Sequence, residues 1–328
     1  MKFGLIICTF ERATALLRVL DSVKAQAVYP NQILIIDGSL THNTKEALQA
    51  YSIPNLDYYY VQEKHRGLTR QRNFGIAKLS SELDIAFFLD DDVDLVSDYF
   101  ENILDTYKNY PDALGVGGYI LDDSINWQKA ENGPVLYDEY EFDGWKRKLG
   151  SRNVLRKKLN LLSDCAPGIM PAFSNGFSIG FLPPSGKTYS VEFFIGCAMS
   201  FRISKVKNIK FSNYFEGYGL YEDMEYCLRV SKLGQLYVNT SARLYHYHDP
   251  DGRPNQFRYG KMVIENGWHV WRTKYEKPSL KARLKWYKIA YLLTFVRLSN
   301  VFSTSKRQEA FTEFLGRMRA LLATPFKH

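Results

Sequence analysis

The sequence predicts an α/β protein whose sheet is covered by helices on both faces, and three observations support that prediction. Short, continuous apolar runs recur through the first 120 residues. Segments whose apolar residues have helical spacing separate these runs, and polar residues gather directly after several of them. Fully apolar strands that alternate with helices are typical of a parallel sheet buried on both sides.

The expected elements follow in chain order. Strands are expected at residues 3–8, 32–37, 56–62, 84–89 and 113–120, and helices at 13–26, 43–51, 69–78 and 97–107. The next segment, 121–190, is polar, aromatic and rich in Gly, Pro and Asn, so loops and small elements are expected there. A strand is expected again within 191–204, then a helix within 220–234 and a strand within 235–250. The pattern is of Rossmann type, in which ligands bind beyond the carboxyl ends of the strands.

The composition is that of a globular protein, with 45% hydrophobic and 24% charged residues. No N-terminal signal peptide is expected, because Glu11 and Arg12 interrupt the first apolar run. No run reaches the roughly 18 apolar residues that a membrane-spanning helix needs. The four cysteines have no CxxC spacing, which favours reduced, mostly buried thiols and a cytoplasmic location.

The positive charge is concentrated at the C-terminal end. The formal net charge is +8, and residues 279–328 contain ten Lys and Arg against two Glu. The rest of the chain is therefore neutral, which argues against a nucleic-acid partner, and it has no nucleic-acid-binding motif. Two helices are expected in this tail, with Lys281, Lys285 and Lys288 on one narrow wedge. Docking on an anionic membrane surface and packing against the main domain or a partner chain are the two interpretations.

Two common nucleotide-binding motifs are missing. The turn "CTFERAT" after the first strand has no glycine, which argues against a dinucleotide-binding oxidoreductase. The stretch "GFLPPSGKT" resembles a P-loop, but five residues rather than four separate its glycines. Its two prolines also lack the N–H groups that would bind phosphate.

Three consecutive aspartates, Asp90, Asp91 and Asp92, follow the apolar run "IAFFL". Like charges this close repel each other, at a cost on the order of several kcal/mol in a low dielectric. A divalent cation such as Mg²⁺ or Mn²⁺ would offset the repulsion, because hard cations prefer carboxylate oxygens. The alternative is a solvated acidic turn that caps the next helix.

Other candidates lie after the first three strands. Asp37, at a strand end, can accept a hydrogen bond from N3–H of a uracil or thymine ring. Thr9 and Glu11 are expected at the same edge of the sheet. Arg66 and Arg70 follow the third strand, where they can reach phosphate. The alternatives are a turn-forming role for the aspartate and surface ion pairs for the arginines.

Seven segments occur in a distinctive order, "CTFER", "DGS", "GLTRQRNFGI", "FLDDDVD", "GCAMSFR", "GYGLYEDMEYCLR" and "YHYH". In this order they resemble the inverting glycosyltransferases of family 2, over residues 3–250. The resemblance implies a GT-A fold, in which a Rossmann-like nucleotide-binding sheet is fused to an acceptor-binding half. A C-terminal helical tail follows that fold in this chain.

The resemblance also implies a metal site. Asp90 and Asp92 match the outer members of the family's DxD motif, with Asp92 on Mn²⁺ or Mg²⁺ and with Asp90 and Asp91 on the nucleotide side. His246 and His248 alternate on an extended segment, where family members often place one metal-binding or phosphate-binding histidine. His246 is favoured by its position over His248.

The catalytic base is expected in "EDMEY". Asp223 matches the family's catalytic aspartate, and a carboxylate suffices to deprotonate an acceptor hydroxyl. Glu222 is a candidate second acid, but neighbours on a helix point about 100° apart, so one of the two is expected to face the acceptor. Glu225 is expected on the solvated side. The alternative is that Glu222 and Asp223 only favour a helix N-terminus electrostatically.

The expected organisation is a glycosyltransferase domain over residues 1–275 and a basic helical region over 276–328. The domain is divided into a nucleotide-sugar-binding half (1–120) and an acceptor-binding half (121–275).

The resemblance implies metal-dependent transfer from a UDP- or dTDP-sugar, with UDP favoured, to a glycan or lipid-linked acceptor in surface polysaccharide synthesis. A cytoplasmic enzyme, peripheral at the inner face of the plasma membrane, fits that acceptor, and a homo-oligomer is left open. The first alternative is a nucleotidyltransferase, although "CTFERAT" lacks a Gly-rich, Lys-bearing loop. The second is a non-catalytic nucleotide-sugar-binding or glycan-binding protein of the same fold.

Overall fold

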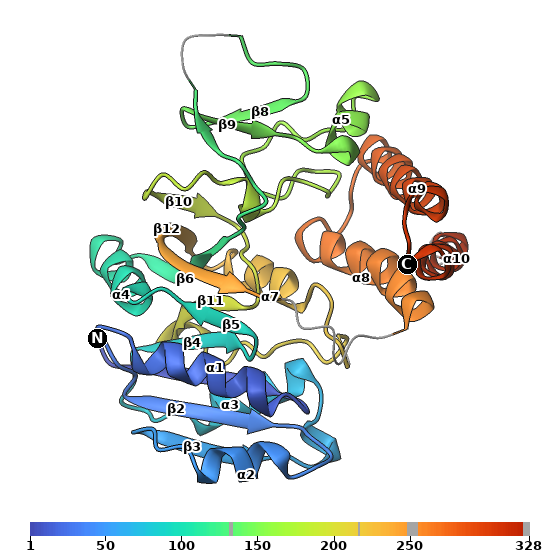
Figure 1. The fold of residues 1–328 in the computed structure, drawn as a ribbon. Helices are drawn as coiled ribbons and strands as arrows, with labels where there is room; N and C mark the ends of the chain where they lie inside the picture. The colour runs from blue at the N-terminus through green and yellow to red at the C-terminus, as the bar shows by residue number, and fades with distance from the viewer. Residues whose placement is uncertain (131–133, 216, 248–254, 324–328) are drawn as a thin grey trace. The chain divides into compact units, whose positions relative to one another are not determined.

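The computed structural model describes residues 1–130, 134–215, 217–247 and 255–323. The chain forms two compact units (Figure 1). Unit 1 consists of residues 1–123 and 184–252, and unit 2 of residues 124–183 and 253–328. The predicted domain limits at residues 120 and 275 stay predictions.

Unit 1 is built on one sheet of nine strands. These are β1 (Phe3–Thr9), β2 (Gln32–Asp37), β3 (Leu56–Tyr60), β4 (Ile85–Asp90), β5 (Val93–Leu95), β6 (Ala113–Leu121), β10 (Thr188–Val191), β11 (Ala198–Arg202) and β12 (Gln235–His246). The order is β10-β12-β6-β11-β4-β1-β2-β3, and β5 pairs with β12. The first four strands are parallel, as predicted. The sheet as a whole is mixed, because β11 runs antiparallel between β4 and β6.

The helices of unit 1 lie on both faces of this sheet. They are α1 (Ala13–Lys24), α2 (Asn43–Gln49), α3 (Leu68–Lys78), α4 (Tyr99–Asn109), α6 (Ile203–Val206) and α7 (Glu222–Val230), with a short 3₁₀ turn at Glu63–His65. On one face, α1 and α4 pack against side chains such as Leu5 and Phe87 in a single apolar core. On the other face, α3 approaches so closely that a Cβ at Gly75 would collide with Ile6. The predicted coverage of both faces is confirmed.

Unit 2 contains a small sheet and four longer helices. The sheet is β7 (Gln128–Lys129), β9 (Trp145–Lys148) and β8 (Glu139–Phe142), in that order. The helices are α5 (Ser151–Lys158), α8 (Gln256–Lys274), α9 (Leu280–Ser303) and α10 (Arg307–Ala323), and a 3₁₀ turn covers Ile179–Phe181.

The two expected tail helices, α9 and α10, are part of the packing of unit 2. Trp286 of α9 stacks parallel to Trp271 of α8, with ring centroids 5.9 Å apart, and Trp268 meets it edge-on at 4.9 Å. Lys285, one of the three wedge lysines, lies over the ring of Phe173 at 3.7 Å. Within the described part of the chain, no helix is long and apolar enough to cross a membrane.

Candidate functional site

The carboxyl ends of three neighbouring strands bring the predicted site residues together in unit 1. In the parallel registers of β1, Thr9 lies opposite Asp37 of β2, and Cys8 lies opposite Asp90 of β4. The apolar runs fill both faces of the sheet, so each strand delivers its first polar side chain where it leaves the core. The site is therefore at the sheet edge where an α/β fold binds its ligands.

Asp91 is a buried member of the acidic cluster, held by residues from the end of β1. Its two oxygens accept hydrogen bonds from Thr9 Oγ1 at 2.6 Å and from Arg12 Nη1 at 3.0 Å. Burial raises the pKa of Asp91 to about 6, although both of these partners favour the charged form. Asp91 thus fixes the turn between β4 and β5, and its predicted contact with a nucleotide stays a prediction.

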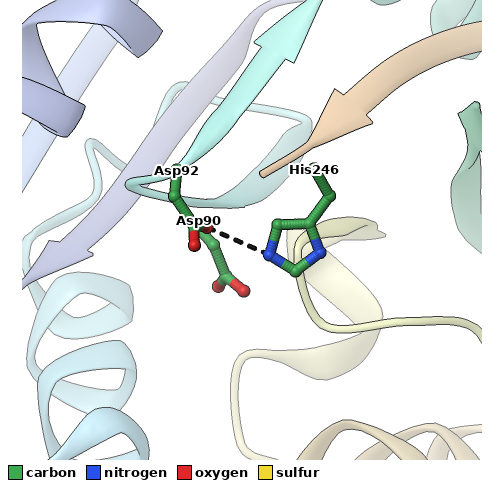
Figure 2. A group of neighbouring side chains, drawn as sticks. All are labelled: Asp90, Asp92 and His246. Atoms are coloured by element: carbon green, nitrogen blue, oxygen red, sulfur yellow. Dashed lines mark ion pairs between the residues drawn. The ribbon is translucent and has the colours of Figure 1, made fainter. Parts of the chain in front are cut away.

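Asp92 faces His246 across two paired strands. β5 follows the acidic turn and pairs with the end of β12, so that Val93 lies opposite His246. His246 Nε2 then reaches Asp92 Oδ1 at 3.0 Å (Figure 2). Burial lowers the pKa of His246, but the hydrogen bond to Asp92 and the charges of Asp90 and Asp92 outweigh burial and raise it. Two segments more than a hundred and fifty residues apart therefore meet at this point.

Asp90, Asp92 and His246 together form a donor set suited to a divalent cation. One ligand atom from each lies within 4.8 Å of the others, and Figure 2 shows the three side chains converging. In an octahedral site with bonds of about 2.1 Å, ligands are roughly 3–4 Å apart, so a small adjustment suffices. Two carboxylates and one imidazole are donors that Mn²⁺ accepts. His248 lies outside the described residues.

Arg72 of α3 joins the acidic cluster to the start of α7. Its guanidinium donates to Asp90 Oδ1 at 3.1 Å and to the Gly196 carbonyl at 3.0 Å, and its other nitrogen pairs with Glu222. Arg72 and Glu222 are both buried. Burial lowers the pKa of Arg72, but the charges of Glu222 and Asp90 outweigh it and raise the pKa, so the guanidinium stays charged.

The two acids that begin α7 have different surroundings. Asp223 accepts hydrogen bonds from the backbone N–H of Gly196 at 2.7 Å and of Met224 at 2.7 Å, one on each oxygen. Glu222 is held by Arg72 and by the N–H of Asp223 at 2.6 Å. Burial raises the pKa of both, and the charge of Asp223 adds to the shift of Glu222. Asp223 remains partly exposed, whereas Glu222 is buried.

The prediction for Glu225 was wrong. Its side chain is buried and pairs with Arg229 one turn later, at 2.7 Å. The reason is that α7 buries most of its circumference, including Tyr226, which stacks on Phe211 at 4.0 Å.

Glu11 and Asp37, which were predicted to contact the nucleotide, make hydrogen bonds with the loops that follow β1 and β2. Glu11 accepts hydrogen bonds from the N–H groups of Leu40 at 2.6 Å and Thr41 at 3.0 Å, and from Thr41 Oγ1 at 2.6 Å. The hydroxyl of Thr41 is the main reason why the pKa of Glu11 is lowered. Asp37 is fully buried and accepts from Ser39 N at 2.8 Å and Tyr58 Oη at 2.7 Å. A base could reach the Asp37 carboxylate only if these neighbours shifted.

The two arginines predicted at the diphosphate have different positions. Arg66 donates to the Ser39 carbonyl at 3.3 Å and to Tyr60 Oη at 3.4 Å, so it borders the base-side loop. Arg70 lies in the first turn of α3. Their roles at phosphate stay predictions.

Two arginines for which the sequence predicted no specific contact are central to the site. Arg12 holds Asp91 and lies 3.6 Å from Asp92, and Arg72 holds Asp90 and Glu222. Both occur in quoted segments, "CTFER" and "GLTRQRNFGI". The sequence feature that could have pointed to these arginines is electrostatic. Five acids at one edge of the sheet require cationic partners.

The fold matches solved glycosyltransferase structures. The mannosyltransferase PcManGT from Pyrobaculum calidifontis, in complex with GDP-Man and Mn²⁺, has a TM-score of 0.53 at 13% identity, covering 99% of this chain and 87% of that chain. GalNAc-T7 with UDP, GalNAc and Mn²⁺ has a TM-score of 0.52 at 14% identity, covering 89% of this chain and 54% of that chain. The predicted GT-A fold is confirmed.

The sequence matches the family model described as Glycosyl transferase family 2 over residues 5–177, more than half of the chain. The chain therefore belongs to glycosyl transferase family 2, and the nucleotidyltransferase alternative is set aside. A curated relative, the glucosyl-dolichyl phosphate glucuronosyltransferase of Haloferax volcanii, is 29% identical over 128 residues. That alignment covers 38% of this chain and 40% of the relative, so the match spans less than half of the relative's length.

Proposed function

We propose that this glycosyltransferase is metal-dependent and inverting, and that it moves a sugar from a UDP-sugar, or less favourably a dTDP-sugar, to an acceptor hydroxyl. One observation supports this best. Arg72 contacts Asp90 of the cation-binding set, Glu222 at the start of α7, and the peptide of Gly196, whose N–H binds Asp223. Arg72 therefore connects the side chains that would bind the metal with the proposed general base. Inverting transfer needs both in one site, because the acceptor attacks the same carbon that the diphosphate leaves.

The metal would be held by Asp90, Asp92 and His246. Mn²⁺ is favoured over Mg²⁺, because an imidazole nitrogen suits a transition metal better than Mg²⁺. When bound, the ion would act as a Lewis acid on the diphosphate and stabilise it as a leaving group.

Asp223 is the proposed general base. The acceptor oxygen forms a bond to the anomeric carbon from the face opposite the diphosphate, while the bond from that carbon to the diphosphate oxygen breaks. Asp223 takes the hydroxyl proton, and the configuration inverts. The two backbone N–H groups orient the carboxylate without using all of its lone pairs. Glu222 is less suited, because it is buried against Arg72.

The donor and acceptor follow from separate arguments. The preference for uracil or thymine rests on Asp37 at the end of β2 and requires the shift of Tyr58 or Ser39 described above. The matched structures contain GDP-Man in one case and UDP in the other, so the fold accommodates both bases. The dolichyl phosphate in the name of the curated relative supports a lipid-linked glycan acceptor, and hence surface polysaccharide synthesis in the cytoplasm beside the membrane.

A donor panel tests the proposal. UDP-, dTDP- and GDP-sugars are titrated calorimetrically with Mn²⁺, with Mg²⁺ and with chelator, and release of the nucleoside diphosphate is followed. UDP-sugars should bind in Mn²⁺, and Asp92→Asn should weaken that binding at least about 10–100-fold, as loss of a metal-site partner does.

Asp98→Asn is the matched control, since Asp98 is exposed before α4 and its side chain makes no capping hydrogen bond. It removes the same charge and should leave donor binding unchanged. Metal-independent binding, or a clear preference for GDP-sugars, would contradict the proposed donor site.

A further inference from the structure

The helices α9 and α10 expose large apolar side chains on one side. On α9 these are Leu280, Leu284, Phe295 and Phe302, whose spacing places them on one helical face. Phe302 is 83% exposed and Leu280 is 71% exposed. On α10 the same holds for Phe311, Leu315 and Leu322. These seven side chains are called the apolar face below.

The apolar face is not the core side of these helices. α9 buries Trp286, Ile289 and Ala290 on its other side, where Trp286 packs against the tryptophans of α8. The exposed stripes of the two helices adjoin, because Phe314 lies 6.2 Å from Phe295 and 6.3 Å from Phe311 between ring centroids. The exposed apolar side chains of the two helices therefore meet around Phe295, Phe314 and Phe311. Exposed apolar surfaces of this kind mark interaction sites.

Cations border the apolar face. Lys281 and Lys288 lie three residues before and four after Leu284, and Arg319 lies four residues after Leu315, all exposed. The sequence of α9 contains no acidic residue.

The two acids of α10 are already paired with cations of α9, of α10 or of the turn between them. Glu313 is buried and bound by Arg297 at 2.7 Å and Arg317 at 2.6 Å. Glu309 lies 3.7 Å from Lys306. The border of the apolar face is therefore strongly positive.

We propose that the apolar face docks flat on an anionic lipid bilayer. Its side chains would enter the boundary between headgroups and acyl chains, while Lys281, Lys288 and Arg319 would contact lipid phosphates. A second copy of this chain is a poorer partner, because two identical faces would bring the same cations opposite each other. The apolar face belongs to unit 2 and the candidate donor site to unit 1, and neither donor nor metal enters the test of this inference.

Vesicle flotation of the full chain tests this docking. The vesicles are phosphatidylcholine alone, or equal parts of phosphatidylcholine and phosphatidylglycerol. Binding should occur only to the anionic vesicles and weaken with added salt. The double variant Lys281→Gln/Lys288→Gln should lose roughly fivefold in affinity for each lysine, and Leu284→Ser/Phe302→Ser should lose at least about tenfold.

Leu233→Ser is the matched control, since Leu233 is a 63% exposed leucine of unit 1. Leu233→Ser should bind anionic vesicles as tightly as the unchanged chain does. The melting temperature of every variant should equal that of the unchanged chain. Equal binding to both vesicle types, or unchanged binding of the apolar-face variant, would overturn the proposal. A dimer of the unchanged chain in sedimentation equilibrium, converted to a monomer by Leu284→Ser/Phe302→Ser, would also overturn the proposal.

Discussion

Two adjacent carboxylates at the start of α7 are distinguished by their hydrogen bonds. Glu222 is buried and pairs with the buried Arg72, so that removing its charge leaves Asp90 as the remaining acid that pairs with the guanidinium in the described residues. Asp223 is partly exposed, and among the described residues it is held by the backbone N–H groups of Gly196 and Met224. The same pair of acids thus divides into a group that stabilises the site and a group that can exchange a proton.

Replacing Asp223 by Asn should therefore separate chemistry from binding. The amide cannot accept a proton at neutral pH, so kcat should fall by about 10²–10⁴, the usual effect of losing a general base. Binding of metal and donor, measured by calorimetry, should stay near normal, because Asp223 is not among the cation donors.

Glu222→Gln is the companion variant, and it should show the reverse. It breaks a buried pair, which costs about 3–5 kcal/mol of stability in chemical denaturation, and should reduce kcat less than Asp223→Asn does. Equal losses of kcat would mean that the acids act as a unit. Loss of donor binding in Asp223→Asn would place the base elsewhere.

The proposed role of Asp223 as general base predicts a pH dependence of the reaction. Burial raises the pKa of Asp223, while the N–H groups of Met224 and Gly196 oppose the shift. A base must be ionised, so kcat should fall about tenfold per pH unit below that raised pKa, which lies above the value of about 3.9 for a free aspartate. The profile is measured at saturating metal, donor and acceptor. Constant donor affinity over the same pH range excludes loss of the metal as the cause, and an acid limb at or below pH 4 would refute the assignment.

At the scale of elements, the sequence predicted the strands whose side chains are buried on both faces. β1, β2 and β4 are continuous apolar runs, and their ends agree with the expected ones within a residue or two. The place of β11 between β4 and β6 was not predictable, because antiparallel insertion depends on tertiary pairing and not on composition. The helix α8 was not among the predicted elements, although its buried Ile264, Trp268 and Trp271 have helical spacing.

The candidate site likewise has residues that could be predicted from the sequence and contacts that could not. Asp90, Asp92, Asp223 and His246 could be proposed from motif order, since each lies near the end of a predicted element. The partners of Arg72 could not, because Asp90 and Glu222 are 18 and 150 residues away along the chain. Local pattern predicts which side chains reach an edge of the sheet, and only the fold decides which of them meet.

The contact between α8 and α10 depends on two glycines. A Cβ at Gly260 would overlap the backbone carbonyl of Glu313, and a Cβ at Gly316 would overlap that of Phe257. Backbone atoms cannot change rotamer, so Gly260→Ala or Gly316→Ala should push the helices apart. Each should cost about 1–3 kcal/mol in chemical denaturation, despite the better helix propensity of alanine.

Gly180→Ala is the control for that prediction. Its added Cβ would have Ser178 Oγ as nearest neighbour at an ordinary 3.5 Å. It should leave stability within about 0.5 kcal/mol of the unchanged chain. If the α8 and α10 variants are as stable as this control, the close helix contact does not exist.

In the whole molecule, the candidate site residues and the net positive charge belong to different units. All candidate site residues belong to unit 1, whereas the excess of +8 within residues 279–328 belongs to unit 2. Substitutions at the candidate site and substitutions on α9 and α10 therefore test different units of the chain.

Removing residues 278–328 should consequently damage unit 2 and spare donor binding. The truncation takes away Trp286, which packs on Trp268 and Trp271 of α8, and it leaves these two tryptophans without their cover. The thermal transition should move to lower temperature by several degrees or split in two, while Mn²⁺-dependent UDP binding persists. Trp286→Ala keeps the tail and should reproduce the destabilisation, at about 3–5 kcal/mol. An unchanged calorimetric melting profile in both variants would show that α9 is not part of the core of unit 2. Loss of UDP binding in Trp286→Ala at a temperature where unit 1 is folded would show that the donor site depends on unit 2.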